Sequence, residues 1–188
     1  ALRLRPESAE IENNFGYALM SRGEYAAAIP HFARALQLRS DYVYAYNNLG
    51  LAMLTLGRLA EAEVPLRTAV RLKPEYPEAQ LNLGLTLAQR GQTAEAFQHF
   101  ATAVRRRPAY VEAEFNWAIG LALASRFTEA FPHFARAAQL APDRPDIQNA
   151  FGRALELDGR LDDAIGRYRE AVRLAPDFAE AHFNLARV

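Results

Sequence analysis

A period of 34 residues constrains this chain more than any other feature of its sequence. Prolines with this spacing stand at Pro74, Pro108, Pro142 and Pro176, and Pro6 lies two periods before the first of them. Small residues and large residues recur in the same register, in the columns Gly16, Gly50, Gly84, Ala118, Gly152, then Ala28, Ala62, Ala96, Ala130, Ala164, and Phe32, Leu66, Phe100, Phe134, Tyr168. Self-similarity at a fixed period of this length indicates a tandem array of one structural unit.

Residues 77–110 define that unit. Two helical patterns, at about 78–90 and 94–107, are joined by a turn at Gly91 and closed by Pro108. The small side chains at Gly84 and Ala96 allow the two helices to approach closely, whereas larger ones would force them apart. Glycine adopts a left-handed conformation at low cost, and proline cannot continue a helix. Each unit is therefore predicted to be a helix–turn–helix.

Composition excludes several classes of protein. The chain has 22 Lys and Arg against 22 Asp and Glu, which argues against a nucleic-acid binder. It has no cysteine, so structural disulfides and cysteine-based zinc sites are excluded. The sequence contains no run of about 18 apolar residues, so insertion into a membrane is not predicted. Nearly all the positive charge is arginine, which favours a bacterial source. The cytoplasm is the favoured compartment, although an N-terminal signal can have been removed.

The columns resemble the tetratricopeptide repeat (TPR), whose consensus is close to the segment NLGLTLAQRGQTAEAFQHFATAVRRRP. The resemblance spans the chain and implies an all-α fold, an α-solenoid of tandem antiparallel helix pairs in a right-handed superhelix, with the first helix of each pair on the concave face. It predicts a single TPR domain, 1–188, made of a repeat tail at 1–8, full repeats at 9–42, 43–76, 77–110, 111–144 and 145–178, and the first helix of a sixth repeat at 179–188. Both ends break inside a repeat, so a fragment of a longer protein is expected.

The resemblance also implies that ligands lie along the concave groove, at positions 2, 5, 6, 9, 12 and 13 of each repeat. Position 6 carries Asn14, Asn48, Asn82, Asn116 and Asn184, with Ala150 as the interruption. A carboxamide has one acceptor and two donors, so it can bind a peptide backbone at two points. This row is similar to the asparagine ladder of TPR superhelices that bind extended peptides. Shared ancestry, or hydrogen bonds between adjacent repeats, is the alternative interpretation.

Two further strips complete the candidate peptide-binding residues. Apolar side chains at position 9 and mixed ones at position 5 suggest a binding surface if they are exposed. Carboxylates at position 2 favour a ligand with Lys or Arg, or they complement the helix dipole. The lack of Lys and Arg at positions 2, 5 and 6 makes a chaperone carboxylate clamp a poor match. The candidates in these strips are Tyr17, Leu51, Leu85 and Ile119 at position 9, Asn47 and Phe115 at position 5, and Tyr44, Glu78 and Glu112 at position 2.

No residue pattern predicts catalysis, a cofactor or a metal site. His31, His99 and His133 share repeat position 23, which is best interpreted as repeat ancestry. No nucleophile motif or glycine-rich phosphate loop is present. The function expected is therefore a non-enzymatic scaffold for protein–protein interaction that binds an extended peptide or partner segment. Two alternatives stay open, namely the substrate-recruiting TPR region of a larger enzyme such as a glycosyltransferase, and a scaffold that self-associates through its cut repeat ends.

Overall fold

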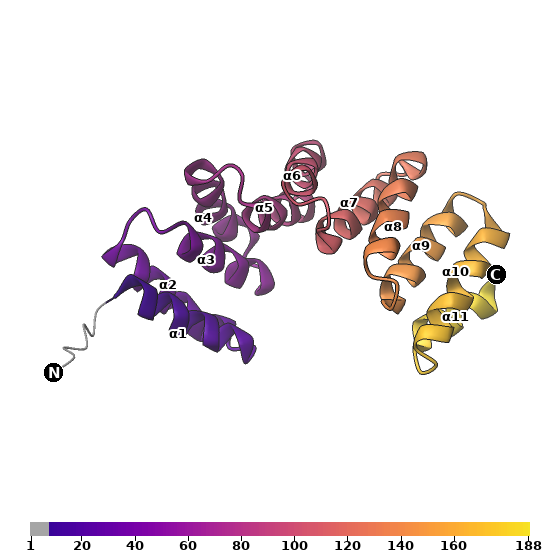
Figure 1. Ribbon diagram of the computed structural model, residues 1–188, viewed down its shortest axis with the longest axis horizontal. Helices are drawn as coiled ribbons and strands as arrows, with labels where there is room; N and C mark the ends of the chain where they lie inside the picture. The colour runs from indigo at the N-terminus through magenta and orange to yellow at the C-terminus, as the bar shows by residue number, and fades with distance from the viewer. Residues whose placement is uncertain (1–7) are drawn as a thin grey trace. The chain divides into compact units, whose positions relative to one another are not determined.

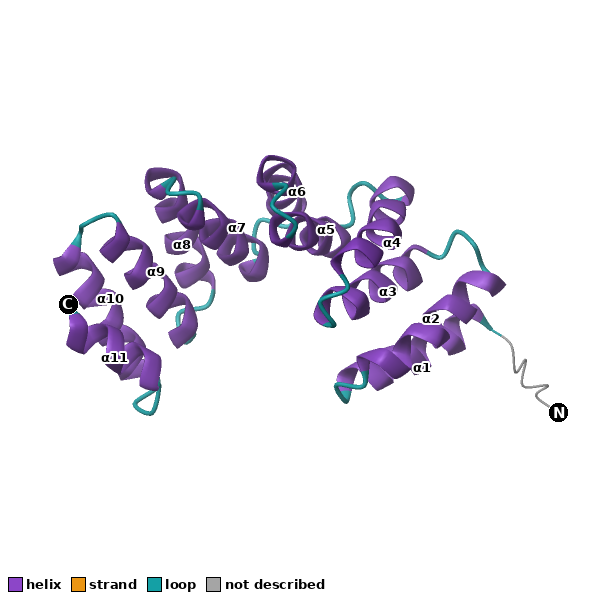
Figure 2. Cartoon of the chain, turned by 180° about the vertical axis from the view of Figure 1, so that it is seen from behind, coloured by secondary structure: helices purple, strands orange, loops and turns teal. Residues whose placement is uncertain are grey.

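The computed structural model describes residues 8–188, and every regular element in that stretch is an α-helix (Figure 1). Short loops connect the helices (Figure 2). The helices are α1 Ala9–Ser21, α2 Tyr25–Leu38, α3 Val43–Thr55, α4 Leu59–Leu72, α5 Pro77–Gln89, α6 Thr93–Arg106, α7 Val111–Leu123, α8 Phe127–Leu140, α9 Pro145–Leu157, α10 Leu161–Leu174 and α11 Ala179–Arg187. The predicted all-α class is confirmed. Except for Ser8, which caps α1, the predicted repeat tail at 1–8 lies outside the described residues.

The helices form two compact units. The first ends at Arg106 and includes α1–α6, and the second begins at Arg107 and includes α7–α11. In each unit, an odd-numbered helix packs against the even-numbered helix that follows it. The first helices of neighbouring pairs also contact each other. In the first unit α1 contacts α3 and α3 contacts α5, and in the second α7 contacts α9 and α9 contacts α11. The assignment of one domain with the stated repeat boundaries stays a prediction.

The turn inside a helix pair follows the predicted chemistry. Gly91 has a φ of 78°, in the left-handed region, and its N–H donates to the Ala88 carbonyl at 3.0 Å. The Gln92 N–H donates to the Leu87 carbonyl at 2.9 Å, so the two bonds close a Schellman motif at the end of α5. The α7–α8 turn is the exception in composition, because Ser125 adopts the same conformation with a φ of 56°.

The small-residue columns mark the closest approach of the two helices in a pair. A Cβ atom added at Gly84 of α5 would lie 2.6 Å from Phe100 of α6, and one at Gly152 of α9 would lie 2.6 Å from Tyr168 of α10. Each ring fills the space over its glycine and is fully buried. The predicted close approach of the two helices at their small residues is confirmed, and this packing fixes which face of each first helix stays outside.

Within residues 8–188, no helix combines the length and the apolar character needed to cross a bilayer.

Candidate functional site

The asparagine row of the first unit is a chain of hydrogen bonds. Asn82 Nδ2 donates to Asn47 Oδ1 at 2.9 Å, and Asn48 Nδ2 donates to Asn13 Oδ1 at 3.0 Å. Longer contacts within one helix connect these bonds, from Asn47 to Asn48 at 3.4 Å and from Asn13 to Asn14 at 3.5 Å. Position 6 of one repeat therefore donates to position 5 of the preceding repeat, so the first-unit asparagines join α5, α3 and α1.

The row of the second unit is incomplete. Asn184 of α11 donates to Asn149 of α9 at 2.9 Å, which repeats the pattern of the first unit. Asn116 instead donates to the backbone carbonyl of Glu112, one turn earlier in α7. Between α7 and α9 the two positions are Phe115 and Ala150, so no carboxamide pair can form there.

Burial divides the predicted row. Asn82 is 7% exposed and Asn184 is 5% exposed, and Asn47 is also buried. Asn14 is exposed, whereas Asn48 and Asn116 are half-buried. Binding of a peptide backbone by this row requires amides that are open to solvent, and those of Asn82 and Asn184 are not, because they lie between neighbouring helices. Hydrogen bonding between adjacent repeats, the alternative interpretation of the row, is present; peptide capture by the row stays a prediction.

The remaining predicted residues differ in their access to solvent. Tyr17, Tyr44 and Glu112 are exposed. The others are partly covered by their neighbours, since adjacent first helices pack through the same positions. The half-buried residues are Leu51, Leu85, Ile119, Phe115 and Glu78.

The carboxylates at repeat position 2, which include Glu10, Glu112 and Asp146, are largely neutralised by arginine. Glu10 pairs with Arg39 at 2.9 Å. Asp146 pairs with Arg144 at 2.6 Å, and this hydrogen-bonded guanidinium holds the pKa of the Asp146 carboxyl below its usual value. Arg144 also reaches the Glu112 carboxylate at 3.4 Å. These pairs reduce the negative potential that a basic ligand would meet, so the structure gives little support to a preference for Lys or Arg.

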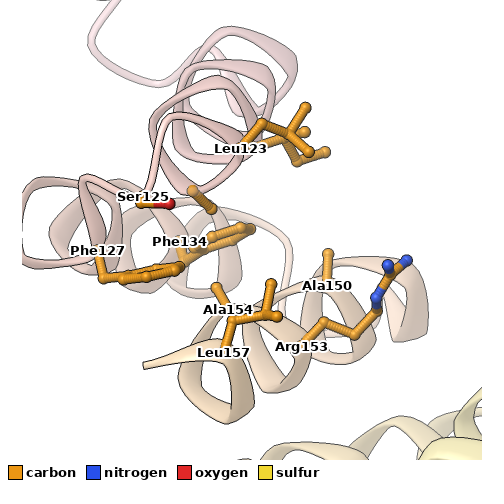
Figure 3. Close-up of a pocket in the computed structure, with 10 residues that line it drawn as sticks. Leu123, Ser125, Phe127, Phe134, Ala150, Arg153, Ala154 and Leu157 are labelled. Atoms are coloured by element: carbon orange, nitrogen blue, oxygen red, sulfur yellow. The ribbon is translucent and has the colours of Figure 1, made fainter. Parts of the chain in front are cut away.

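A pocket of about 410 Å³ opens between α7 and α9 of the second unit (Figure 3). Its lining is apolar except for the Ser125 turn and Arg153. Leu123, at the end of α7, is 82% exposed, and Leu157, at the end of α9, is 67% exposed. Exposed leucines beside a cavity are the features of a binding surface. The lining residues are Ile119, Ala122, Leu123, Ser125, Phe127, Phe134, Ala150, Arg153, Ala154 and Leu157.

The pocket coincides with departures from the repeat pattern. Ala150 stands where the other first helices carry the row asparagine, and Arg153 stands where the preceding repeats carry an apolar residue. Position 13 is polar in the first unit, at Ser21, Thr55 and Gln89, but it is leucine in the second, at Leu123 and Leu157. Among the lining residues, Ile119 alone belongs to the predicted site. Departure from the columns is the signal that could have found Ala150, Arg153 and the two leucines, whereas Phe134 follows its column and gives no such signal.

The histidine column connects the two helices of a pair. His31 Nδ1 lies 2.8 Å from Glu12 Oε2, and His133 Nδ1 lies 2.6 Å from Glu114 Oε2. His99 makes the equivalent contact to Gln80 Oε1, at 2.6 Å. These bonds recur from repeat position 23 to position 4, so repeat geometry accounts for the column. No group of His, Cys, Asp or Glu side chains in residues 8–188 has the arrangement of a metal site.

Solved structures similar to this chain are repeat proteins. YrrB, described as a TPR protein with an unusual peptide-binding site, is 24% identical over 95% of this chain and 92% of its own, with a TM-score of 0.75. TTC0263, a thermophilic TPR protein of Thermus thermophilus, is 25% identical over 96% of this chain and 98% of its own, with a TM-score of 0.76. A MamA protein is 19% identical over 93% of this chain and 96% of its own, with a TM-score of 0.77. No curated protein sequence matches the chain.

Family models give the same result along the sequence. A TPR repeat model matches residues 16–57 and 152–188, and two tetratricopeptide repeat models match residues 43–73 and 65–111. Together these matches extend over well more than half of the chain. TPR proteins bind protein or peptide partners and are generally non-enzymatic scaffolds. Its matched repeats, its helix pairs and the small-residue contacts inside them place this chain in the tetratricopeptide repeat family.

Proposed function

We propose that this chain is a protein-interaction scaffold that binds an extended peptide segment of a partner on its first-helix face. By first-helix face we mean the solvent side of α1, α3 and α5 in the first unit, and of α7, α9 and α11 in the second. The pocket between α7 and α9 carries the proposal. It combines an apolar cavity with two strongly exposed leucines, Leu123 and Leu157, at its edge.

Energetics favour this site for an anchor side chain. Leu123 and Leu157 expose apolar area to water at no evident structural gain, and covering them would contribute about 25 cal/mol for each Å². Fully buried Phe134 lines the pocket, so part of it is formed by the helix-pair core. A rigid pocket lowers the ordering cost of binding, because only the peptide has to lose conformational freedom.

The asparagines have a narrower part in this proposal than their sequence pattern suggests. Asn14 is exposed and Asn48 and Asn116 are half-buried, so these three remain candidates to contact a peptide backbone. Asn82 and Asn184 hold neighbouring helices together and set the spacing of the face on which the others lie. The similarity to YrrB, whose description includes a peptide-binding site, supports a peptide as the partner.

The test is a selection of random peptides of about ten residues against the purified chain, followed by titration calorimetry with the enriched sequences. The variant Leu123→Ser/Leu157→Ser should lose most of the affinity for these peptides. Val64→Ser is the matched control, because Val64 is 69% exposed but lies on α4, a second helix. Affinity that is unchanged in the double variant and in Asn14→Ala/Asn48→Ala would exclude the first-helix face as the binding surface.

A further inference from the structure

We infer that the pocket between α7 and α9 selects peptides in which a bulky apolar side chain stands beside a carboxylate, with Arg153 binding the carboxylate. The inference rests on the proposed function and specifies the chemistry of the partner at this one pocket. It concerns the second unit alone, because all the lining residues belong to α7, α8, α9 and their turn.

The apolar half of the motif follows from the walls of the pocket. Leu123 and Leu157 approach it from opposite helices, and the Phe134 ring lines it from α8 (Figure 3). The small side chain of Ala150 leaves the space open, whereas the asparagine found at this position in the other first helices would project into it. A pocket of about 410 Å³ accommodates a leucine, a methionine or an aromatic side chain.

The acidic half follows from Arg153. Its guanidinium is the one charged group in the lining, and its side chain is 59% exposed. An arginine fork matches the two oxygens of a carboxylate, which distinguishes acidic from amide side chains better than a point charge does. An acidic residue next to the apolar anchor would therefore place its carboxylate at the pocket edge, against this guanidinium.

Arg153 is available for such a partner. Its ion pair among the described residues is with Glu180 of α11, at 3.6 Å between Arg153 Nη1 and Glu180 Oε1. By comparison, Arg144 holds Asp146 at 2.6 Å with two hydrogen bonds. A long, exposed pair contributes little and is readily exchanged. The Glu180 carboxylate thus occupies the place that a peptide carboxylate would take, and it competes with the ligand for Arg153.

The experiment uses the peptides enriched by the selection described above. Each enriched peptide is compared with two synthetic versions, one with its acidic residue changed to the amide and one with its apolar anchor changed to alanine. We expect the change to the amide to weaken binding to the wild-type chain about two- to five-fold, the range for an exposed ion pair. The same change should have no effect on binding to Arg153→Leu, which restores the apolar residue typical of this position. Glu180→Gln should tighten binding of the acidic peptide because it removes the competing carboxylate.

The outcomes separate this inference from the proposed function. Enriched peptides that need Leu123 and Leu157 but contain no acidic residue, or that bind Arg153→Leu as well as the wild type, overturn the inference and leave the proposed function intact. If no first-helix substitution changes the affinity for the peptides, or if the selection enriches no peptide, the inference and the proposed function are both overturned. Ala150→Asn is the independent check of the pocket, because it restores the common residue and should block the anchor while the chain stays folded.

Discussion

Asn82 of α5 donates its side-chain N–H to Asn47 Oδ1 of α3 at 2.9 Å, and both residues are buried. The bond crosses between adjacent repeats, so the carboxamide acts as a spacer that fixes the register of neighbouring first helices. A buried donor without its acceptor costs more than the net worth of the bond, because the donor has also lost its water.

The first prediction concerns that bond. Asn47→Ala should lower the free energy of unfolding by about 1–3 kcal/mol, since it leaves the Asn82 donor buried without its acceptor. Asn14→Ala is the control, because Asn14 is exposed and its contact to Asn13 is long, at 3.5 Å. Both substitutions replace asparagine by alanine inside a helix and gain the same helix propensity, so the difference between the unfolding free energies of the two variants isolates the bond. Urea denaturation measures it, and equal stabilities for the two variants would contradict the spacer role.

The second prediction uses two glycines that differ in their surroundings. Gly84→Ala should destabilise by about 1–3 kcal/mol, because the new Cβ would lie 2.6 Å from a ring of Phe100 that is fully buried and cannot move cheaply. Gly166→Ala, inside α10, meets no atom within 4 Å and should stabilise by about 0.5–1 kcal/mol through helix propensity. Opposite signs in thermal melts are the expected result; a stabilised Gly84 variant would refute the close approach.

The third prediction concerns the turn conformation. Ser125→Gly should stabilise the chain by about 0.5–1 kcal/mol, because serine at a φ of 56° bears a steric cost that glycine avoids. Gly91→Ser is the reciprocal change in the α5–α6 turn, where an added Cβ has nothing within 4 Å, so its cost is conformational alone. It should destabilise by about 1–2 kcal/mol. Urea midpoints that move in the same direction for both variants would argue against this explanation.

Most of the fold could be predicted from the sequence, because its determinants are local and repeated. The expected helices at 78–90 and 94–107 are found as α5 and α6, each shifted by one residue. The turn at Gly91 needs only the conformational preference of one residue, and the packing of Phe100 over Gly84 needs only two helices at a known separation.

The candidate site was harder to predict because its properties depend on more than one repeat. The exposure of Asn82 is decided by Asn47, a residue of the preceding repeat at another column, and a single column does not reveal that pairing. The pocket depends on Ala150 and Arg153, which the sequence pattern marks only as exceptions. The paired state of Glu10 depends on Arg39, which reaches it from the end of the adjacent helix.

The last prediction concerns acid sensitivity at His99, on α6. Burial lowers the pKa of the His99 imidazole, and this outweighs the opposing effect of Glu95, while Nδ1 contacts Gln80 Oε1 at 2.6 Å. The unfolded chain, in which His titrates near its ordinary value of 6.5, therefore binds more protons than the folded chain below that pH. Stability is fully present above about pH 6.5 and is lost as pH falls toward the folded pKa. His99→Gln should lose less stability than the wild type between about pH 7.5 and 5.5 in urea denaturation. Equal losses of stability in the wild type and in His99→Gln would contradict the role of His99.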